Sequence, residues 1–244
     1  MAKHELLNNI THKNLKVLTE KSEFLGSKVA YSVIFPFEFK HVQADYPIFF
    51  LKDKDTSQFS AIALFGFEQG ENLFLSDEGW EASYIPMFVE REPFLIGFQQ
   101  EQSNGEAQPL IHIDMDSPRV NEEAGINVFL EHGGNSEYLN RISTILKTLH
   151  DSKESTDLFL NTIQDLELIE PLNLDIQLND GSNNRLSGFH TINEDKLANL
   201  SGQQLESLNK SGLLHVIYMV IASHANLTSL IQKKDKRVKS QNSL

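Results

Sequence analysis

The chain has 244 residues, a formal net charge of −13 and no cysteine. A disulfide scaffold, a thiol nucleophile and a thiolate zinc site are therefore excluded. The acidic balance disfavours nucleic acid as a partner, because binding to phosphates depends on cationic contacts. Hydrophobic residues make up 40% of the chain, which is enough for one large domain or two small ones.

The sequence predicts neither a membrane span nor a secretory signal. The longest apolar run extends from Leu213 to Ala222, is interrupted by His215, and has about half of the ~20 residues that a span needs. Residues 1–10 contain no continuous apolar core and no small-residue cleavage site. We therefore expect a cytoplasmic protein that is not an integral membrane protein. Association with the cell envelope is the alternative.

Short segments rich in β-forming residues, separated by polar turns, fill the chain from about residue 27 to residue 116. They cover residues 27–35, 48–51, 59–67, 72–75, 94–100 and 110–115. The polar turn at 52–57 predicts a hairpin between two of them. Segments joined by such tight turns favour an antiparallel sheet that is strongly curled or closed into a small barrel. Most of the 16 phenylalanines precede residue 100, so this part is expected to have an aromatic-rich core.

The second half shows helical patterns and one hairpin. Residues 117–134 read as a loop, and apolar residues at helical spacing then predict helices from about Ser136 to Leu149 and from about Thr156 to Leu166. Strict alternation from Leu172 to Leu178 predicts a strand, which the Asp180-Gly181 turn joins to a second strand ending near Ile192.

Two further helices are expected near the carboxyl end. Ser201 and Gln204 have the spacing of a capping box. A last helix over residues 211–233 is apolar nearly all round as far as Ala222. Such a helix is buried inside the protein or lies in an interface.

These patterns predict an α+β fold. A curled antiparallel β-sheet or small barrel forms the N-terminal half, and helices with a β-hairpin form the C-terminal half. The expected division is a β-rich part at 1–116 and a mainly helical part at 117–244 with the hairpin at 172–192. One continuous domain is the alternative.

The block at residues 70–86 contains the only tryptophan and is the first candidate binding site. Asn72, Trp80 and Tyr84 could line a pocket or a peptide groove, since such sites combine aromatic walls with a few polar anchors. The competing interpretation is that the two aromatic residues close one end of the sheet while Asn72 holds a turn. Arg91 could bind a carboxylate. Its acidic neighbours Glu90 and Glu92 equally fit a surface ion pair.

His112 and Asp114 form a His-x-Asp pattern on one face of a predicted strand. With a distant histidine (His132, His190 or His215) they would make the ligand set of a non-haem iron site. A three-residue pattern is common by chance, so a polar outer strand face is favoured and no metal or other cofactor is expected. Nucleotide-binding loops, a nucleophile elbow and a zinc-protease motif are absent from the sequence.

Segments spread over most of the chain carry a family resemblance. They are Asp45-Tyr46-Pro47-Ile48-Phe49-Phe50, Ala63-Leu64-Phe65-Gly66-Phe67, Gly79-Trp80, Tyr84-Ile85-Pro86, Ser117-Pro118-Arg119-Val120, Ile192-Asn193-Glu194-Asp195 and Ser211-Gly212-Leu213-Leu214-His215-Val216-Ile217-Tyr218. With these segments in the same order as in the SapC family, the chain resembles that family. The resemblance covers the chain from about Tyr31 to Leu230.

The resemblance implies two possible functions. One is a link to a bacterial surface layer, and the other is a peptide-transporter permease, which the shared family name suggests. The lack of an expected membrane span argues against the permease. Family members also look like companions of tryptophan-halogenase-like flavoproteins in bacterial nutrient-uptake gene sets. The resemblance implies no catalytic residues.

We therefore expect a non-catalytic binding or accessory protein whose partner is another protein, such as a flavoenzyme of that class. The block at 72–86 and the last helix are the expected contact surfaces, and a homo-oligomer through the last helix is also open. A surface-layer or envelope-associated protein is the alternative. A metal-dependent enzyme centred on His112 and Asp114 is a second alternative.

Overall fold

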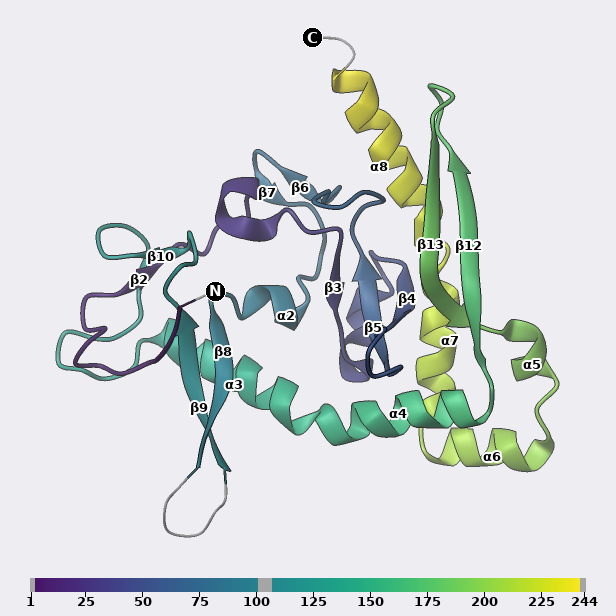
Figure 1. Ribbon diagram of the computed structural model, residues 1–244, viewed down its shortest axis with the longest axis horizontal. Coiled ribbons are helices and arrows are strands. Elements are labelled where there is room, and N and C mark those ends of the chain that lie inside the picture. Colours follow the sequence, from purple (N-terminus) through teal and green to yellow (C-terminus); the bar gives the residue numbers. More distant parts are fainter. Residues whose placement is uncertain (1–2, 101–106, 242–244) are drawn as a thin grey trace. The chain divides into compact units, whose positions relative to one another are not determined.

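The computed structural model describes residues 3–100 and 107–241. The chain forms two compact units that interleave along the sequence (Figure 1). Unit 1 contains Met1–Ser27, Asp77–Trp80 and Met87–Asp151, and unit 2 contains Lys28–Ser76, Glu81–Pro86 and Ser152–Leu244. Residues on both sides of position 116 thus contribute to each unit.

Unit 2 is built on a five-stranded antiparallel sheet with the order β12-β13-β4-β5-β3. Its strands are β3 (Tyr31–Val33), β4 (Ile48–Lys52), β5 (Phe59–Leu64), β12 (Ile169–Gln177) and β13 (Asn183–Ile192). The polar turn at 52–57 joins β4 to β5, as the sequence predicts, and β12 pairs with β13 along most of its length. The C-terminal hairpin therefore extends a sheet that the N-terminal half begins.

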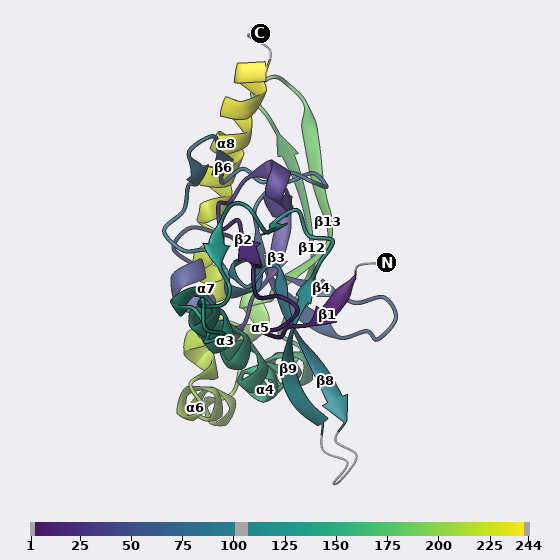
Figure 2. The same ribbon diagram turned by 90° about the vertical axis from the view of Figure 1, so that its left-hand side faces the viewer.

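Helices pack on this sheet. Two of them, α7 (Leu213–Ser223) and α8 (Asn226–Gln241), extend in the same general direction as the β12–β13 hairpin (Figures 1 and 2). The remaining described elements of unit 2 are η2 (Pro36–Glu38), α1 (Phe39–Val42), β6 (Leu75–Ser76), α4 (Lys153–Asp165), α5 (Glu194–Ala198), α6 (Gly202–Lys210), α7 (Leu213–Ser223) and α8 (Asn226–Gln241).

The core of unit 2 is rich in aromatic side chains. Phe39, Phe50 and Phe65 are fully buried. Phe159 of α4 meets the Phe39 ring edge-on at 5.9 Å between centroids. The predicted aromatic core of the first half is thus completed by a helix from the second half.

Unit 1 contains a three-stranded antiparallel sheet, β1-β9-β8, and a small sheet, β10-β2-β11. Its elements are β1 (His4–Leu6), β2 (Lys16–Val17), η1 (Glu23–Ser27), β7 (Gly79–Trp80), α2 (Met87–Glu90), β8 (Phe94–Gln100), β9 (Ala107–Asp114), β10 (Val120–Asn121), β11 (Ile126–Asn127) and α3 (Glu137–Asp151). β1 and β2, and the strands in the predicted loop at 117–134, were not expected.

The α+β class is confirmed, but the small barrel is wrong. The strands of the first half do not form one sheet: β4 and β5 belong to the five-stranded sheet of unit 2, and β8 and β9 belong to the three-stranded sheet of unit 1. The five-stranded sheet ends at β12 and β3, which do not pair with each other. Without that last pairing, the five-stranded sheet does not close into a barrel.

The last helix is not continuous. α7 ends at Ser223, and a turn at His224 and Ala225 separates it from α8. The hydroxyl of Ser223 accepts a hydrogen bond from the Ile48 amide at 2.8 Å and donates one to the Val220 carbonyl at 2.5 Å. This contact holds the end of α7 against β4, a constraint that local sequence does not show.

The segment Leu213–Ser240, which spans α7 and α8, is long and apolar enough by length and composition to cross a membrane. Only 28% of its most apolar window is buried in the protein. A core helix of a soluble protein passes the same test of length and composition.

Candidate functional site

Asn72 and Tyr84 belong to unit 2, where both hold the chain in place. Asn72 is buried; its Oδ1 accepts a hydrogen bond from the Phe74 amide at 3.0 Å, and its carbonyl accepts one from Arg237 at 2.9 Å. The hydroxyl of Tyr84 donates to Glu38 Oε1 at 2.9 Å. Neither residue lines the cavity described below, and their assignment to a binding site stays a prediction.

Trp80 and Arg91 belong to unit 1. Trp80 is half-buried in β7. The guanidinium of Arg91 lies 4.0 Å from the centre of the Phe88 ring, and Nη1 donates to the Phe94 carbonyl at 2.6 Å. Burial lowers the pKa of Arg91, which stays charged at neutral pH. Its proposed grip on a carboxylate also stays a prediction.

His112 and Asp114 lie on β9, on either side of the buried Ile113. Asp114 Oδ1 accepts a hydrogen bond from the Asp116 amide at 3.1 Å, which closes the turn after the strand. Within residues 3–100 and 107–241, no group of three or more His, Asp or Glu side chains is placed to hold a metal ion.

A cavity of about 320 Å³ lies in unit 2, between the sheet and the α7–α8 turn. Its lining comes from β4, β12, β13, α5 and the start of α8. These residues are Phe49, Glu170, Leu172, Leu174, Thr191, Ile192, Asn193, Glu194, Asp195, His224 and Leu227. The lining combines apolar side chains from the sheet with acidic side chains on β12 (Glu170) and in the first turn of α5 (Glu194 and Asp195).

The sheet register explains how these residues meet. Thr191 lies directly opposite Glu170 across β12 and β13. Alternate residues of a strand share one face, so Leu172 and Leu174 lie on the same face as Glu170. At the end of β13, the Asn193 side chain caps α5 by accepting a hydrogen bond from the Lys196 amide at 2.7 Å. Its Nδ2 donates to Glu170 Oε2 at 2.5 Å.

His224 forms one wall of the cavity, and its ring is held in place. It stacks on Phe49 with 5.2 Å between ring centroids and 21° between ring planes. Its Nε2 lies 3.2 Å from the hydroxyl of Thr191. Burial lowers the pKa of His224, so the ring is neutral at neutral pH. His224 falls in the last predicted helix, which was expected to be buried or to lie in an interface. The sequence did not predict the cavity, because its lining comes from distant segments.

A second cluster of interacting charges lies in unit 1 around Arg119. This side chain is 1% exposed and donates to the carbonyls of Leu18 and Glu20 at 3.2 and 2.8 Å, and to Ser27 Oγ at 2.7 Å. Its Nε makes no hydrogen bond within the described residues and lies 3.7 Å from Glu92 Oε2. Arg119 thus fastens the segment from Leu18 to Ser27 to the body of unit 1.

The pKa values around Arg119 are shifted. Burial, with a smaller contribution from Arg119, lowers the pKa of Lys21 to about 8. Burial raises the pKa of Tyr138 to about 12 and raises the pKa of the Glu92 carboxyl. Shifted pKa values occur in structural ion clusters as well as in active sites. The use of Arg119 to bind backbone carbonyls favours the structural role.

The fold and the cavity define the chain as an α+β protein with open antiparallel sheets and a small cavity on its largest sheet. A family model described as SapC matches residues 7–230 of the 244. The chain therefore belongs to the SapC family. No curated protein matches it. No solved structure matches it either.

Proposed function

We propose that this SapC-family protein is a non-catalytic binding or accessory protein that docks another protein on the exposed face of α7. The observation that carries the proposal is an apolar stripe on this helix, formed by Leu214, Tyr218, Ile221 and Ala222. These positions recur at helical spacing and so share one side of the helix.

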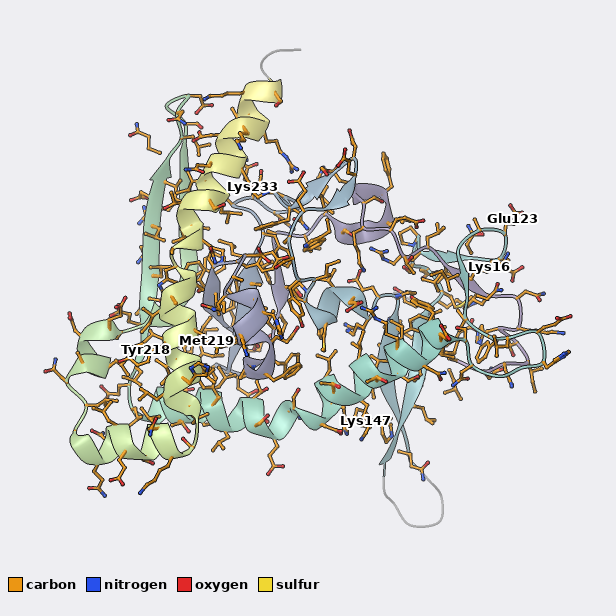
Figure 3. The ribbon with its side chains drawn as sticks, turned by 180° about the vertical axis from the view of Figure 1, so that it is seen from behind. Lys16, Glu123, Lys147, Tyr218, Met219 and Lys233 are labelled. Atoms are coloured by element: carbon orange, nitrogen blue, oxygen red, sulfur yellow. The ribbon has the colours of Figure 1, made fainter. Side chains whose placement is uncertain are left out.

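The stripe is apolar and accessible at the same time. Tyr218 is 53% exposed, whereas its neighbour Met219 is 8% exposed (Figure 3). Leu214 and Ile221 are half-buried. A row of this kind is how a helix docks into an apolar groove of a partner, and tyrosine is over-represented among residues that dominate binding energy. A flavoenzyme of the tryptophan-halogenase-like class, which the family resemblance implies, is the partner to test first.

The test is co-purification of the tagged protein from its own host at native expression, with soluble and envelope fractions analysed separately by mass spectrometry. Tyr218→Glu places a charge in the stripe and should remove a stoichiometric soluble partner. Leu158→Glu is the matched control, because Leu158 is 58% exposed on α4 of the same unit. Binding should then be reproduced with the two purified proteins.

A partner that stays bound to Tyr218→Glu as tightly as to the unchanged protein contradicts docking on α7. Light scattering on the purified protein tests a second copy as the occupant. A dimer that Tyr218→Glu dissociates would replace the accessory proposal with a homo-oligomer through the same helix.

An envelope-associated role is the second candidate, and the apolar segment Leu213–Ser240 is the observation that favours it. Recovery mainly in the envelope fraction, with release by Tyr218→Glu, would support this role and contradict a soluble partner. Recovery in the soluble fraction alone would contradict the envelope role.

A further inference from the structure

We propose that the cavity between the sheet and the α7–α8 turn binds a small organic ammonium ion, with its charge at the acidic rim and its apolar part on the sheet. This inference is independent of docking on α7, because it rests on the cavity and on different residues.

The cavity is large enough for such a ligand. At about 320 Å³ it falls at the small end of the range of ~300–1,000 Å³ that ligand pockets occupy. The apolar part of its lining includes Leu172 and Leu174 of β12, Ile192 of β13 and Leu227 of α8, together with the Phe49 ring that stacks on His224. A short hydrocarbon chain would bury its surface against these side chains.

The charge of the lining selects the sign of the ligand. Glu170, Glu194 and Asp195 contribute three carboxylates, and the lining contains no lysine or arginine. In the part of the chain that the structure describes, no cationic side chain forms an ion pair with any of the three. An anion entering this cavity would meet only negative charge, whereas an ammonium ion would be attracted.

Polar groups are also placed to orient an ammonium group. Glu170 Oε2 accepts a hydrogen bond from Asn193 Nδ2 at 2.5 Å, which orients its carboxylate. The Thr191 hydroxyl lies opposite Glu170, bonded to His224 at 3.2 Å. An ammonium group has three N–H donors and no acceptor, which matches a rim of carboxylate and hydroxyl oxygens. Pre-oriented acceptors lower the ordering cost of binding.

The test uses three probes of one shape: hexylammonium, hexanol and hexanoate, each titrated into the full chain and followed by NMR chemical shifts. Hexylammonium should bind with a dissociation constant of about 1 mM, with the largest shifts at Thr191 and His224. Hexanol should bind at least about tenfold more weakly, and hexanoate should not bind. Equal binding of hexylammonium and hexanol, or no hexylammonium binding up to about 10 mM, would overturn the proposal.

Two variants connect binding to this cavity. Glu194→Gln with Asp195→Asn removes two carboxylates from an exposed helix turn and should weaken hexylammonium binding about tenfold or more. The matched control removes two exposed carboxylates elsewhere, Glu154→Gln with Glu206→Gln, and should leave binding unchanged. Leu227→Trp fills the cavity without changing charge and should abolish binding. Binding that survives both changes lies at another site and contradicts the inference.

Discussion

Lys234 and Glu71 form an ion pair in which both side chains are about nine-tenths buried. The Nζ to Oε1 distance is 2.6 Å, and the side chains are 9% and 11% exposed. Glu68 accepts a second hydrogen bond from the same amine at 2.8 Å. Burial alone would lower the pKa of Lys234, but the hydrogen bonds to Glu68 and Glu71 outweigh it and raise the pKa above its ordinary value. The pair fastens α8 to the loop after β5.

Lys234→Met should lower the free energy of unfolding by about 3 kcal/mol, because it leaves the buried Glu71 carboxylate without its partner. Lys233→Met is the neighbouring control. Lys233 pairs with Glu81 at 3.0 Å, but these side chains are 27% and 49% exposed (Figure 3). An exposed pair of this kind contributes at most about 1 kcal/mol. Chemical denaturation should therefore show a larger loss of unfolding free energy for Lys234→Met than for Lys233→Met. Equal losses would contradict the stabilising role of the buried Lys234–Glu71 pair.

Lys21 should make the stability of the protein rise with pH in the alkaline range. Its pKa is about 8 in the folded protein, against an ordinary value of 10.5. Between these values the unfolded chain holds the proton and the folded protein does not, so the free energy of unfolding increases as pH rises. The increase across this window is at most about 3 kcal/mol.

Chemical denaturation at several pH values measures this increase. Lys21→Met should lack it, whereas the exposed Lys13→Met should retain it. A carbon-13 NMR titration of the Lys21 Cε gives a direct reading. A midpoint near the ordinary lysine value would show that the amine is not desolvated as the structure requires.

Gly97→Ala should destabilise unit 1 through a steric clash with His112. A Cβ added at Gly97 would overlap Nε2 at the end of the half-buried His112 side chain. Overpacking of a core costs about 1–3 kcal/mol, and the loss here should lie at the low end of that range because the ring can turn partly aside. The loss should be smaller when Gly97→Ala is made in a His112→Ala background, since the ring is then absent. Additive losses in the double variant would contradict the clash, and thermal unfolding of the four proteins measures it.

The same His112→Ala protein tests the metal hypothesis. Iron or zinc that purifies with the unchanged protein and is lost from this variant would support a metal site at His112 and Asp114. An unchanged metal content would count against it.

Ser201→Ala should cost about 1 kcal/mol, because it removes the cap of α6. Ser201 Oγ accepts a hydrogen bond from the Gln204 amide at 3.3 Å, and Gln204 Oε1 accepts one from the Ser201 amide at 2.9 Å. Ser229→Ala, at an exposed position inside α8, is the control. It should be neutral or slightly stabilising, since alanine has the higher helix propensity. Equal effects of the two changes would argue against the cap.

Local patterns in the sequence predicted the elements that local physics controls. The alternation from Leu172 to Leu178 predicted β12, because side chains of a strand alternate between its faces. Ser201 and Gln204 predicted the start of α6, because a capping box satisfies the first amides of a helix. The polar turn at 52–57 predicted the β4–β5 hairpin, because a short polar turn between two β-rich segments joins neighbouring antiparallel strands.

Pairing between distant segments was decided only by the tertiary structure. Nothing near β13 in the sequence indicates that it pairs with β4, and this pairing joins the two halves of the chain in one sheet. Likewise, the end of α7 is held by a hydrogen bond between Ser223 and Ile48, and the buried Arg119 donates to carbonyls about a hundred residues away. The cavity follows from the same pairing, because Glu170, Thr191 and His224 meet only when the sheet has formed. Hydrogen-bond partners and packing neighbours of this kind are set by the whole fold, and the spacing of residues along the chain does not encode them locally.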